Sequence, residues 1–104
     1  MYCDDPRNGH AMVIGVGAWQ LSLPECRSLK EKRRVVKSLK ERLQNRFNAS
    51  VAETRHQDVW SRAELTVAVV ASDRAHADSI LDKMDAFVER DGRAMILGVD
   101  RSFR

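Results

Sequence analysis

The sequence predicts a ferredoxin-like α+β domain whose elements follow one another in the order βαββαβ. Two long segments carry apolar residues at the helical spacing of three and four, and four shorter segments have the composition or alternation of strands. Each helical segment lies between two strand segments, which is the order of the split βαβ motif. The motif predicts a four-stranded antiparallel sheet in the spatial order 4-1-3-2, with both helices on one face and the other face open.

The first predicted strand and helix occupy residues 13–23 and 29–46. The strand side chains expected on one face are Trp19, Leu21 and Leu23, and Pro24 ends the strand. Ser28, followed three residues later by Glu31, forms a capping box that starts the helix. The apolar stripe expected on this helix consists of Leu29, Val36, Leu39, Leu43 and Phe47.

A hairpin is predicted next. Residues 48–54 form a weaker strand, and a polar loop over residues 55–63 connects it to residues 64–71. In the latter segment apolar residues alternate with small or polar ones and charge is scarce, so we expect a central strand.

The chain then returns through a second helix and a last strand. Ser72 or Asp73 caps the helix, which runs to about Asp91, and Gly92 suits the left-handed position after it. The side chains expected to be buried are Ala77, Ile80, Leu81, Met84, Phe87 and Val88. Residues 93–99 form the last predicted strand.

Composition bounds the class of protein. A chain of 104 residues with 43% hydrophobic and 32% charged residues is typical of one globular domain. Residues 1–11 are polar, contain Pro and Gly and lack the pattern of a signal peptide, so we expect a disordered leader before a domain over residues 12–104. No apolar run approaches the ~20 residues of a membrane span. Cys3 and Cys26 have no metal spacing, so free thiols in a cytoplasmic protein are expected.

Positive charge is concentrated at the predicted start of the first helix. Nine of the eighteen Lys and Arg residues lie within residues 27–46, against the acids Glu31 and Glu41. Each cation in the first turns of a helix opposes the macrodipole at a cost of roughly 0.3–1 kcal/mol. Such a departure from local rules is typical of functional sites, and helix amides flanked by cations favour anions. A solvated face remains the alternative.

The predicted topology brings the hairpin loop and the end of the second helix beside this helix start. One edge of the domain would therefore collect the bases Arg27, Lys30, Arg33, Arg55, Arg62, Arg90 and Arg93. Lys32 falls on the apolar azimuth one turn before Val36, so we expect its side chain to extend past the sheet edge toward solvent.

Several short segments of the sequence are similar to those of a known protein family. They are Arg-Ser-Leu-Lys-Glu-Lys-Arg-Arg at residues 27–34, Val-Lys-Ser-Leu at 36–39, Asn-Arg-Phe-Asn at 45–48, Val-Ala-Glu at 51–53, His-Gln-Asp at 56–58 with Trp60, Arg62 and Ala63, and Asp-Arg-Ala-His at 73–76. On these residues the chain resembles the YlxP-like family of small bacterial proteins of unknown function. The resemblance implies the ferredoxin-like fold, and the frequent proximity of family genes to genes of translation initiation and ribosome maturation hints at RNA. Gly17 and Trp19 depart from the family pattern, which has a bulky apolar residue at the first position and a smaller residue at the second.

The loop with His56, Asp58 and Trp60 allows three interpretations. The His–Asp pair could transfer protons, or Trp60 and His56 could stack on RNA bases. The favoured alternative is structural, with Trp60 filling the end of the core and Asp58 capping the turn. Cys26 lacks a His in register for nucleophilic catalysis, and the three His residues have no partners at metal-ligand spacing.

The second helix carries an acidic stripe, which consists of Asp78, Asp82, Asp85 and Glu89. We expect ordinary solvation with charge pairing to the basic neighbouring helix, the alternative being a molecule with opposed charged faces. The outward sheet positions in the two central strands, Ala18, Gln20, Ser22, Thr66, Ala68 and Val70, include no aromatic ring for base stacking. Such a face is better suited to a protein partner, including a second copy of the chain. The segment Leu23-Pro24-Glu25-Cys26 is not the Gly-rich phosphate loop of an acylphosphatase.

These observations favour a non-catalytic, cytoplasmic RNA-binding protein that needs no cofactor or metal, and the expected association is with ribosome maturation or translation. The residues expected to contact RNA are Arg27, Lys30, Lys32, Arg33, Arg34, Lys37, His56, Trp60 and Arg62. The alternative is a protein-interaction or homodimerisation module that uses the open sheet face.

Overall fold

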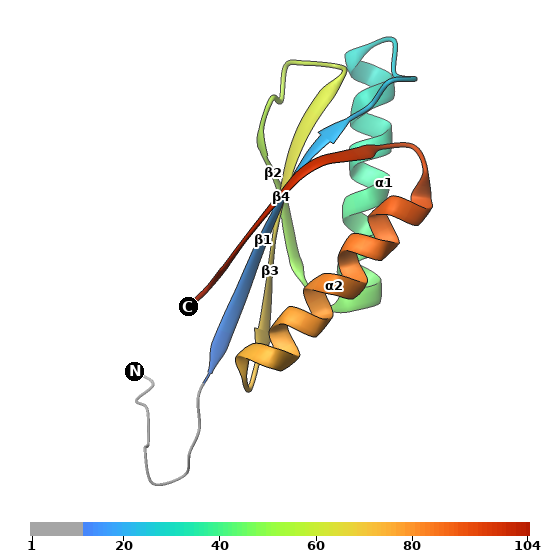
Figure 1. The fold of residues 1–104 in the computed structure, drawn as a ribbon. Coiled ribbons are helices and arrows are strands. Elements are labelled where there is room, and N and C mark those ends of the chain that lie inside the picture. The colour runs from blue at the N-terminus through green and yellow to red at the C-terminus, as the bar shows by residue number, and fades with distance from the viewer. Residues whose placement is uncertain (1–11) are drawn as a thin grey trace, which may run out of the picture.

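A computed structural model, which describes residues 12–104, has the predicted ferredoxin-like topology (Figure 1). The strands are β1 (Val13–Ser22), β2 (Ser50–Arg55), β3 (Arg62–Ala71) and β4 (Met95–Phe103), and the helices are α1 (Leu29–Phe47) and α2 (Arg74–Asp91). They form one antiparallel sheet in the order β2-β3-β1-β4, with both helices on one side of it. The fold class is therefore confirmed. The leader expected over residues 1–11 lies outside the described residues.

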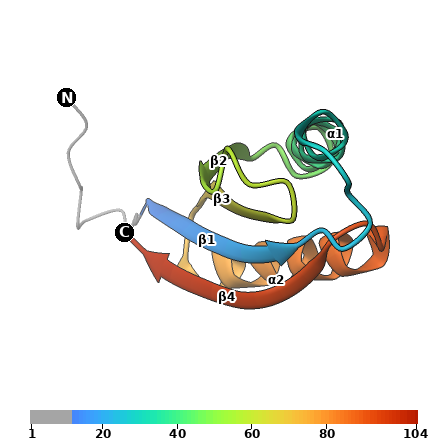
Figure 2. The same cartoon turned by 90° about the horizontal axis from the view of Figure 1, so that it is seen from above.

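Strand register shows which loops meet at one end of the sheet. Ser22, the last residue of β1, pairs with Arg62 at the start of β3 and with Met95 at the start of β4. The connection into α1, the β2–β3 loop and the end of α2 therefore lie at the same end, as the topology predicted. Figure 2, in which the domain is seen from above, shows the connection from β1 passing the end of α2 to reach α1.

The last strand is longer than predicted. Residues 93–99 were expected, whereas β4 extends to Phe103, and its register against β1 shifts between Gln20 and Leu21. Residues 100–102 are Asp, Arg and Ser, so this part of the strand lacks the apolar alternation by which strands are predicted. It is an edge strand, held by backbone hydrogen bonds to β1 rather than by an apolar face.

The core lies between the sheet and the two helices, and β1 forms its centre. Trp19, Leu21 and Leu23 are fully buried. A Cβ atom on Gly15 would lie 3.1 Å from the Cβ of Ala77, so α2 approaches β1 closely and a side chain at this position would require Ala77 to shift by a few tenths of an ångström. A Cβ atom on Gly17 would lie 3.2 Å from Cδ2 of Leu81, so α2 also lies close to β1 at this position.

The acidic stripe of α2 has a partner that the sequence did not suggest. Arg101 of β4 forms ion pairs with Asp78, Asp82 and Asp85 at 2.5, 2.8 and 2.7 Å. Asp85 also accepts a hydrogen bond from the indole Nε1 of Trp19, at 2.6 Å. The stripe therefore faces β4, and the expectation that it pairs with the basic helix is wrong. The prediction failed because Arg101 lay beyond the predicted end of the last strand.

Membrane insertion through a helix has no support in the part of the chain that the structure covers. Neither α1 nor α2 is long and apolar enough to cross a membrane.

Candidate nucleic-acid interface

The first turn of α1 contains the predicted capping box. The Oγ atom of Ser28 accepts a hydrogen bond from the Glu31 amide at 3.1 Å, and Oε1 of Glu31 accepts one from the Arg27 amide at 2.6 Å. The Glu31 carboxylate thus lies at the positive end of the helix. This placement offsets part of the cost of the surrounding cations, because a negative charge at a helix N-terminus is favourable.

Four cations follow one flank of α1. Lys30, Arg33, Lys37 and Lys40 recur at intervals of three and four residues, so they lie one above another on the helix surface. The first three side chains are exposed and that of Lys40 is half-buried. Among residues 12–104 no carboxylate forms an ion pair with any of the four. We call these four residues the α1 stripe. Lys40 was not among the residues expected to contact RNA, although the spacing of the other three cations indicates it.

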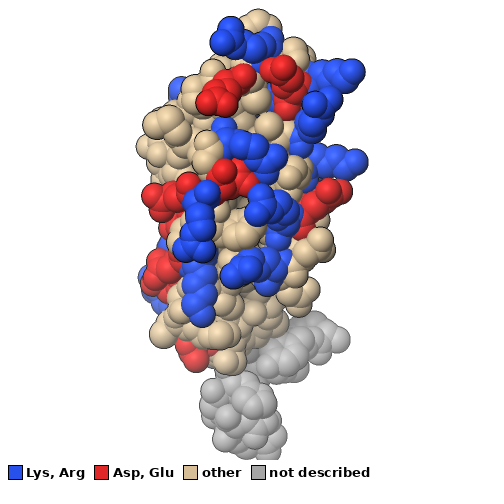
Figure 3. Space-filling view, turned by 90° about the vertical axis from the view of Figure 1, so that its right-hand side faces the viewer, with Lys and Arg blue, Asp and Glu red and all other residues tan. Residues whose placement is uncertain are grey.

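The α1 stripe points away from α2. Contacts to the end of α2 come from Ser38, Arg42 and Arg46, which lie on roughly the opposite side of α1, since each residue advances the helix by about 100°. The stripe therefore borders the β2 side of the domain. Figure 3, which views the molecule from its helical side, shows Lys and Arg side chains along the whole face, with Asp and Glu among them.

Lys32 is a correction to the predicted interface. Its side chain is fully buried, whereas an extension past the sheet edge into solvent was expected. The ammonium donates a hydrogen bond to the carbonyl of His56 and lies 2.7 Å from Oε2 of Glu53 in β2. That carboxylate oxygen makes no hydrogen bond of good geometry in the described residues, so charge attraction holds it to Lys32. Lys32 cannot contact RNA; it anchors the β2–β3 loop beside α1.

The loop that Lys32 anchors has a tight backbone conformation. His56 adopts a left-handed conformation with φ of 66°, and its carbonyl also accepts a hydrogen bond from the Val59 amide at 3.0 Å. The Ser61 carbonyl accepts another from the Leu23 amide, at 2.9 Å. Both ends of the loop are therefore fixed to the domain, the first through α1 and the second through the segment after β1.

Trp60 and Asp58 do not have the structural roles that were favoured for them. The Trp60 side chain is 52% exposed, so it does not fill the end of the core. The core tryptophan is Trp19 instead. The Asp58 side chain is exposed and makes no hydrogen bond to another described residue, so the backbone bond between Val59 and His56 closes the turn. The loop thus presents an exposed aromatic ring and an exposed imidazole beside the first turns of α1.

Not every base expected at this edge is equally available. Arg27, Arg33, Arg34 and Arg62 are exposed, and no ion pair joins them to a carboxylate within the described chain. The Nε atom of Arg55, in contrast, lies 3.7 Å from Oε1 of Glu64. Arg93 binds Asp91 through two nitrogens, at 2.7 and 2.8 Å.

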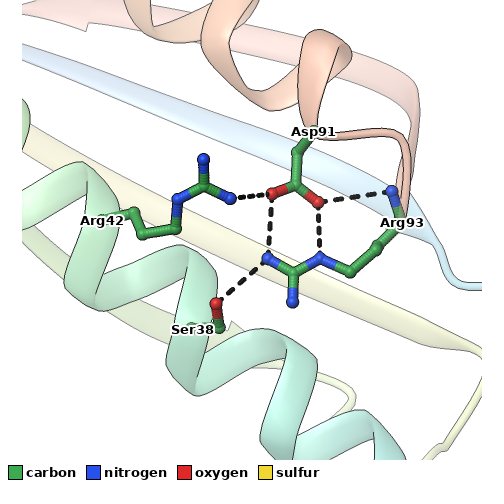
Figure 4. Close-up of polar contacts among 4 residues, drawn as sticks. All are labelled: Ser38, Arg42, Asp91 and Arg93. Carbon is green, nitrogen blue, oxygen red and sulfur yellow. Dashed lines mark hydrogen bonds and ion pairs between the residues drawn. The ribbon is translucent and has the colours of Figure 1, made fainter.

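The interaction of Arg93 with Asp91 is part of a clamp between the helices. Asp91 also accepts a hydrogen bond from Arg42 at 2.6 Å, and Arg93 donates one to the Oγ of Ser38 at 3.0 Å (Figure 4). The hydrogen bonds from Arg93 hold the pKa of the Asp91 carboxyl below its usual range. These cations therefore join α1 to the end of α2 and contribute less to an anion-binding surface.

Two observations concern the reactive groups near this surface. The Cys26 thiol is largely buried, and burial is the main cause that raises its pKa, so the reactive thiolate is disfavoured near neutral pH. Within residues 12–104 no three His, Cys, Asp or Glu side chains are grouped closely enough to hold a metal ion.

Comparison with known proteins identifies the family. Residues 14–101 match the family described as "Protein of unknown function (DUF503)". The chain belongs to this family. It is 36% identical over 77 residues to the uncharacterized protein YlxP of Bacillus subtilis (strain 168), a match that covers 74% of this chain and 84% of that protein. The YlxP-like resemblance expected from the sequence is thereby confirmed.

The match to the DUF503 family covers the candidate interface. The matched residues include the α1 stripe, the anchoring Lys32 and the loop with His56 and Trp60. The family description names no activity, so a function has to be inferred from the chemistry of these residues.

Proposed function

We propose that this DUF503 protein binds RNA, with structured ribosomal RNA or its precursor as the expected target, and that it does so in the cytoplasm without catalysing a reaction. The observation that carries the proposal is the juxtaposition of the α1 stripe, which has no carboxylate partner in the described chain, with an exposed Trp60 on an anchored loop. Contacts from Arg27, Arg34, Arg62 and His56 would extend this surface.

Two kinds of interaction would act together on this surface. Lys and Arg side chains neutralise phosphates and release counterions, which supplies salt-dependent affinity for any polyanion. Exposed aromatic rings stack on unpaired bases, and each stacked base contributes about 1–3 kcal/mol to the binding free energy. RNA offers unpaired bases in loops and bulges, so a basic stripe beside a tryptophan is better suited to RNA than to a regular DNA duplex.

The anchored loop supports the same function. A flexible aromatic residue would lose conformational entropy when it stacked on a base, and the loss would weaken binding. Hydrogen bonds to the His56 and Ser61 carbonyls restrain the loop backbone on both sides of Trp60 before any ligand arrives.

The test is a titration of fluorescently labelled RNA, followed by anisotropy at several salt concentrations. A fragment of ribosomal RNA that contains a hairpin loop serves as the probe, and a DNA duplex of equal length serves as the reference. We expect Lys30→Ala/Arg33→Ala to reduce the slope of log K against log salt by about 1.4 to 1.8, since each lost phosphate contact contributes about 0.7 to 0.9. The matched control, Arg74→Ala/Arg104→Ala, removes the same charge at the opposite end of the sheet and should retain most of the slope.

Trp60 provides a second readout. Base stacking should quench its fluorescence, whereas the fully buried Trp19 should contribute a constant background. Trp60→Leu should abolish the quenching and weaken RNA binding. Equal RNA affinity of the stripe variant and its control, or no response of Trp60 to RNA, would overturn the proposal.

A second candidate function is homodimerisation through the open sheet face. Val70 is 68% exposed and pairs in register with Ile14 on that face, while Met95 is 58% exposed near its other end. Exposed apolar side chains on a sheet face that carries no aromatic ring among its described residues favour a protein partner.

Sedimentation velocity distinguishes the two functions. Ala68→Glu should dissociate such a dimer without affecting the α1 stripe, and a wild-type protein that sediments as a monomer at high concentration would exclude it.

A further inference from the structure

A second cationic feature lies in the groove between α1 and α2. The C-terminal halves of the two helices enclose a depression of about 170 Å³. The side chains that line it are Arg46, Phe47, Lys83, Ala86, Phe87 and Arg90. A neighbouring depression continues along the groove and adds Arg42 and Asp91 to the lining.

The charges that face each other across this groove have the same sign. Arg42 and Arg46 come from α1, and Lys83 and Arg90 come from α2. Asp91 is the one carboxylate in the lining, and it already accepts hydrogen bonds from Arg42 and Arg93. Among the described residues, Arg46, Lys83 and Arg90 have no ion-pair partner.

Three acids of α2 are not available to compensate this charge. Asp78, Asp82 and Asp85 lie on the flank that faces β4, where Arg101 binds all three. These three carboxylates thus face the sheet edge, whereas Lys83, Arg90 and the already engaged Asp91 line the groove toward α1. Arg46 and Arg90 lie in the last turns of their helices, where the macrodipole favours a cation, but Lys83 lies in the middle of α2 and has no such compensation.

Two guanidinium groups in the groove stack on an aromatic ring. The Cζ of Arg42 lies 5.0 Å and that of Arg46 lies 5.7 Å from the centre of the Phe87 ring. Phe87 is itself held by an edge-to-face contact with Phe47, with the ring centres 5.7 Å apart. An arginine that stacks on a ring keeps its N–H groups free at its edge, and this fork matches the oxygens of a phosphate.

We propose that this groove is a phosphate-binding site, with Arg46, Lys83 and Arg90 as the residues that contact the phosphate. The phosphate belongs to an RNA backbone or to a small phosphorylated molecule, because the same donors serve both. The site is distinct from the α1 stripe, since Arg46 lies on the opposite flank of α1. It therefore does not depend on the RNA-binding role of the stripe.

The experiment is an NMR titration of the isotopically labelled protein with inorganic pyrophosphate, followed through the Nε–H signals of the arginines. We expect saturable shifts of Arg46 and Arg90, with little change at Arg74. Arg74 is a suitable internal reference because it also stacks on an aromatic ring, with its Cζ 4.5 Å from the centre of Phe103.

Matched double variants separate the groove from general charge. Arg46→Gln/Lys83→Gln should weaken pyrophosphate binding at least about tenfold, as expected when two charged contacts are lost, while Arg74→Gln/Arg104→Gln should change it less than twofold. The same variants are titrated with a single-stranded RNA of twelve nucleotides. If the phosphate belongs to RNA, the groove variant should reduce the salt slope by about 1.4, which corresponds to two contacts.

The outcomes discriminate among the possibilities. A loss of pyrophosphate binding in the groove variant alone assigns the site to small phosphorylated molecules, and a loss of RNA affinity assigns it to the RNA backbone. The groove site would be overturned if pyrophosphate caused no saturable shifts and the groove variant bound RNA as tightly as wild type. It would also be overturned if the control Arg74→Gln/Arg104→Gln lost as much binding as the groove variant. The stripe variant Lys30→Ala/Arg33→Ala, measured on the same RNA, reports separately on the proposed function.

Discussion

Replacement of Lys32 by methionine tests the most unusual feature of the domain, a fully buried ammonium group. Methionine keeps much of the volume of the lysine stem but removes the charge and the donors. The variant leaves the Glu53 carboxylate, whose side chain is only 16% exposed, without its partner, and it leaves the His56 carbonyl without the hydrogen bond from α1. Two polar groups thus lose their partners with little change in packing.

The magnitude follows from these two losses. Removal of one partner from a buried ion pair typically costs 3–5 kcal/mol, because the remaining charge stays in a poorly solvated position. The partial exposure of Glu53 returns some solvation, so we expect a loss of about 3 kcal/mol in the free energy of unfolding. For a domain of this size that corresponds to a decrease in Tm of roughly 15 °C. The double variant Lys32→Met/Glu53→Gln removes both charges and should recover at least about half of the loss.

Urea-induced unfolding, followed by circular dichroism at neutral pH, measures these differences. Trp60 fluorescence should also change in the native state of Lys32→Met, since the loop loses one of its two anchors. A destabilisation of less than about 1 kcal/mol would show that Lys32 is solvated rather than buried. A double variant no more stable than Lys32→Met would show that the cost arises from packing and not from the unpaired carboxylate.

Three further predictions concern the contacts that hold the helices to the sheet. Arg101→Met should destabilise the domain by about 1–2 kcal/mol, because three aspartates lose a common partner but two of them stay largely exposed; the difference from wild type should shrink in 1 M NaCl. Asp91→Asn should cost about 2 kcal/mol near neutral pH. The pKa of Asp91 is lower in the folded than in the unfolded protein. Its contribution to the free energy of unfolding is therefore fully present above the unfolded-state pKa, near 4, and is lost as the pH falls through the folded-state pKa. Wild type and variant should thus become equally stable in acid unfolding curves. Gly15→Val should cost about 2 kcal/mol through overpacking against α2, and a thermal melt that matches wild type would contradict the close approach at Ala77.

Local chemistry made much of the fold predictable. The capping box at Ser28, the cap at Asp73 and the left-handed Gly92 mark helix ends by hydrogen bonds and backbone angles that depend on neighbouring residues alone. Periodicity likewise identified the buried faces of both helices. The extent of β4 could not be predicted in this way, because its last residues are polar and are held by the backbone of β1, a partner about eighty residues away in the chain.

The candidate site was predictable in composition but not in the roles of its members. Lys32 and Arg33 are adjacent bases in one charged run, yet one is fully buried and the other is exposed. The two tryptophans also differ: Trp19 lies in the core, on the strand face where it was expected, whereas Trp60 was expected to fill the end of the core and is exposed. Such differences depend on which surface lies opposite each side chain.

The sequence by itself determined the order of the elements, the position of the helix ends and the concentration of cations along α1, since each follows from interactions within a few residues. Only the tertiary structure decided which cations have carboxylate partners among the described residues. The carboxylates of Glu53, Asp91 and the acidic stripe come from other elements, and electrostatic attraction depends on distance in space. That arrangement buries Lys32 and engages Arg93 and Arg101. Within residues 12–104 it leaves the α1 stripe and the groove residues Arg46, Lys83 and Arg90 without a carboxylate partner, which is the reason for proposing anion binding there.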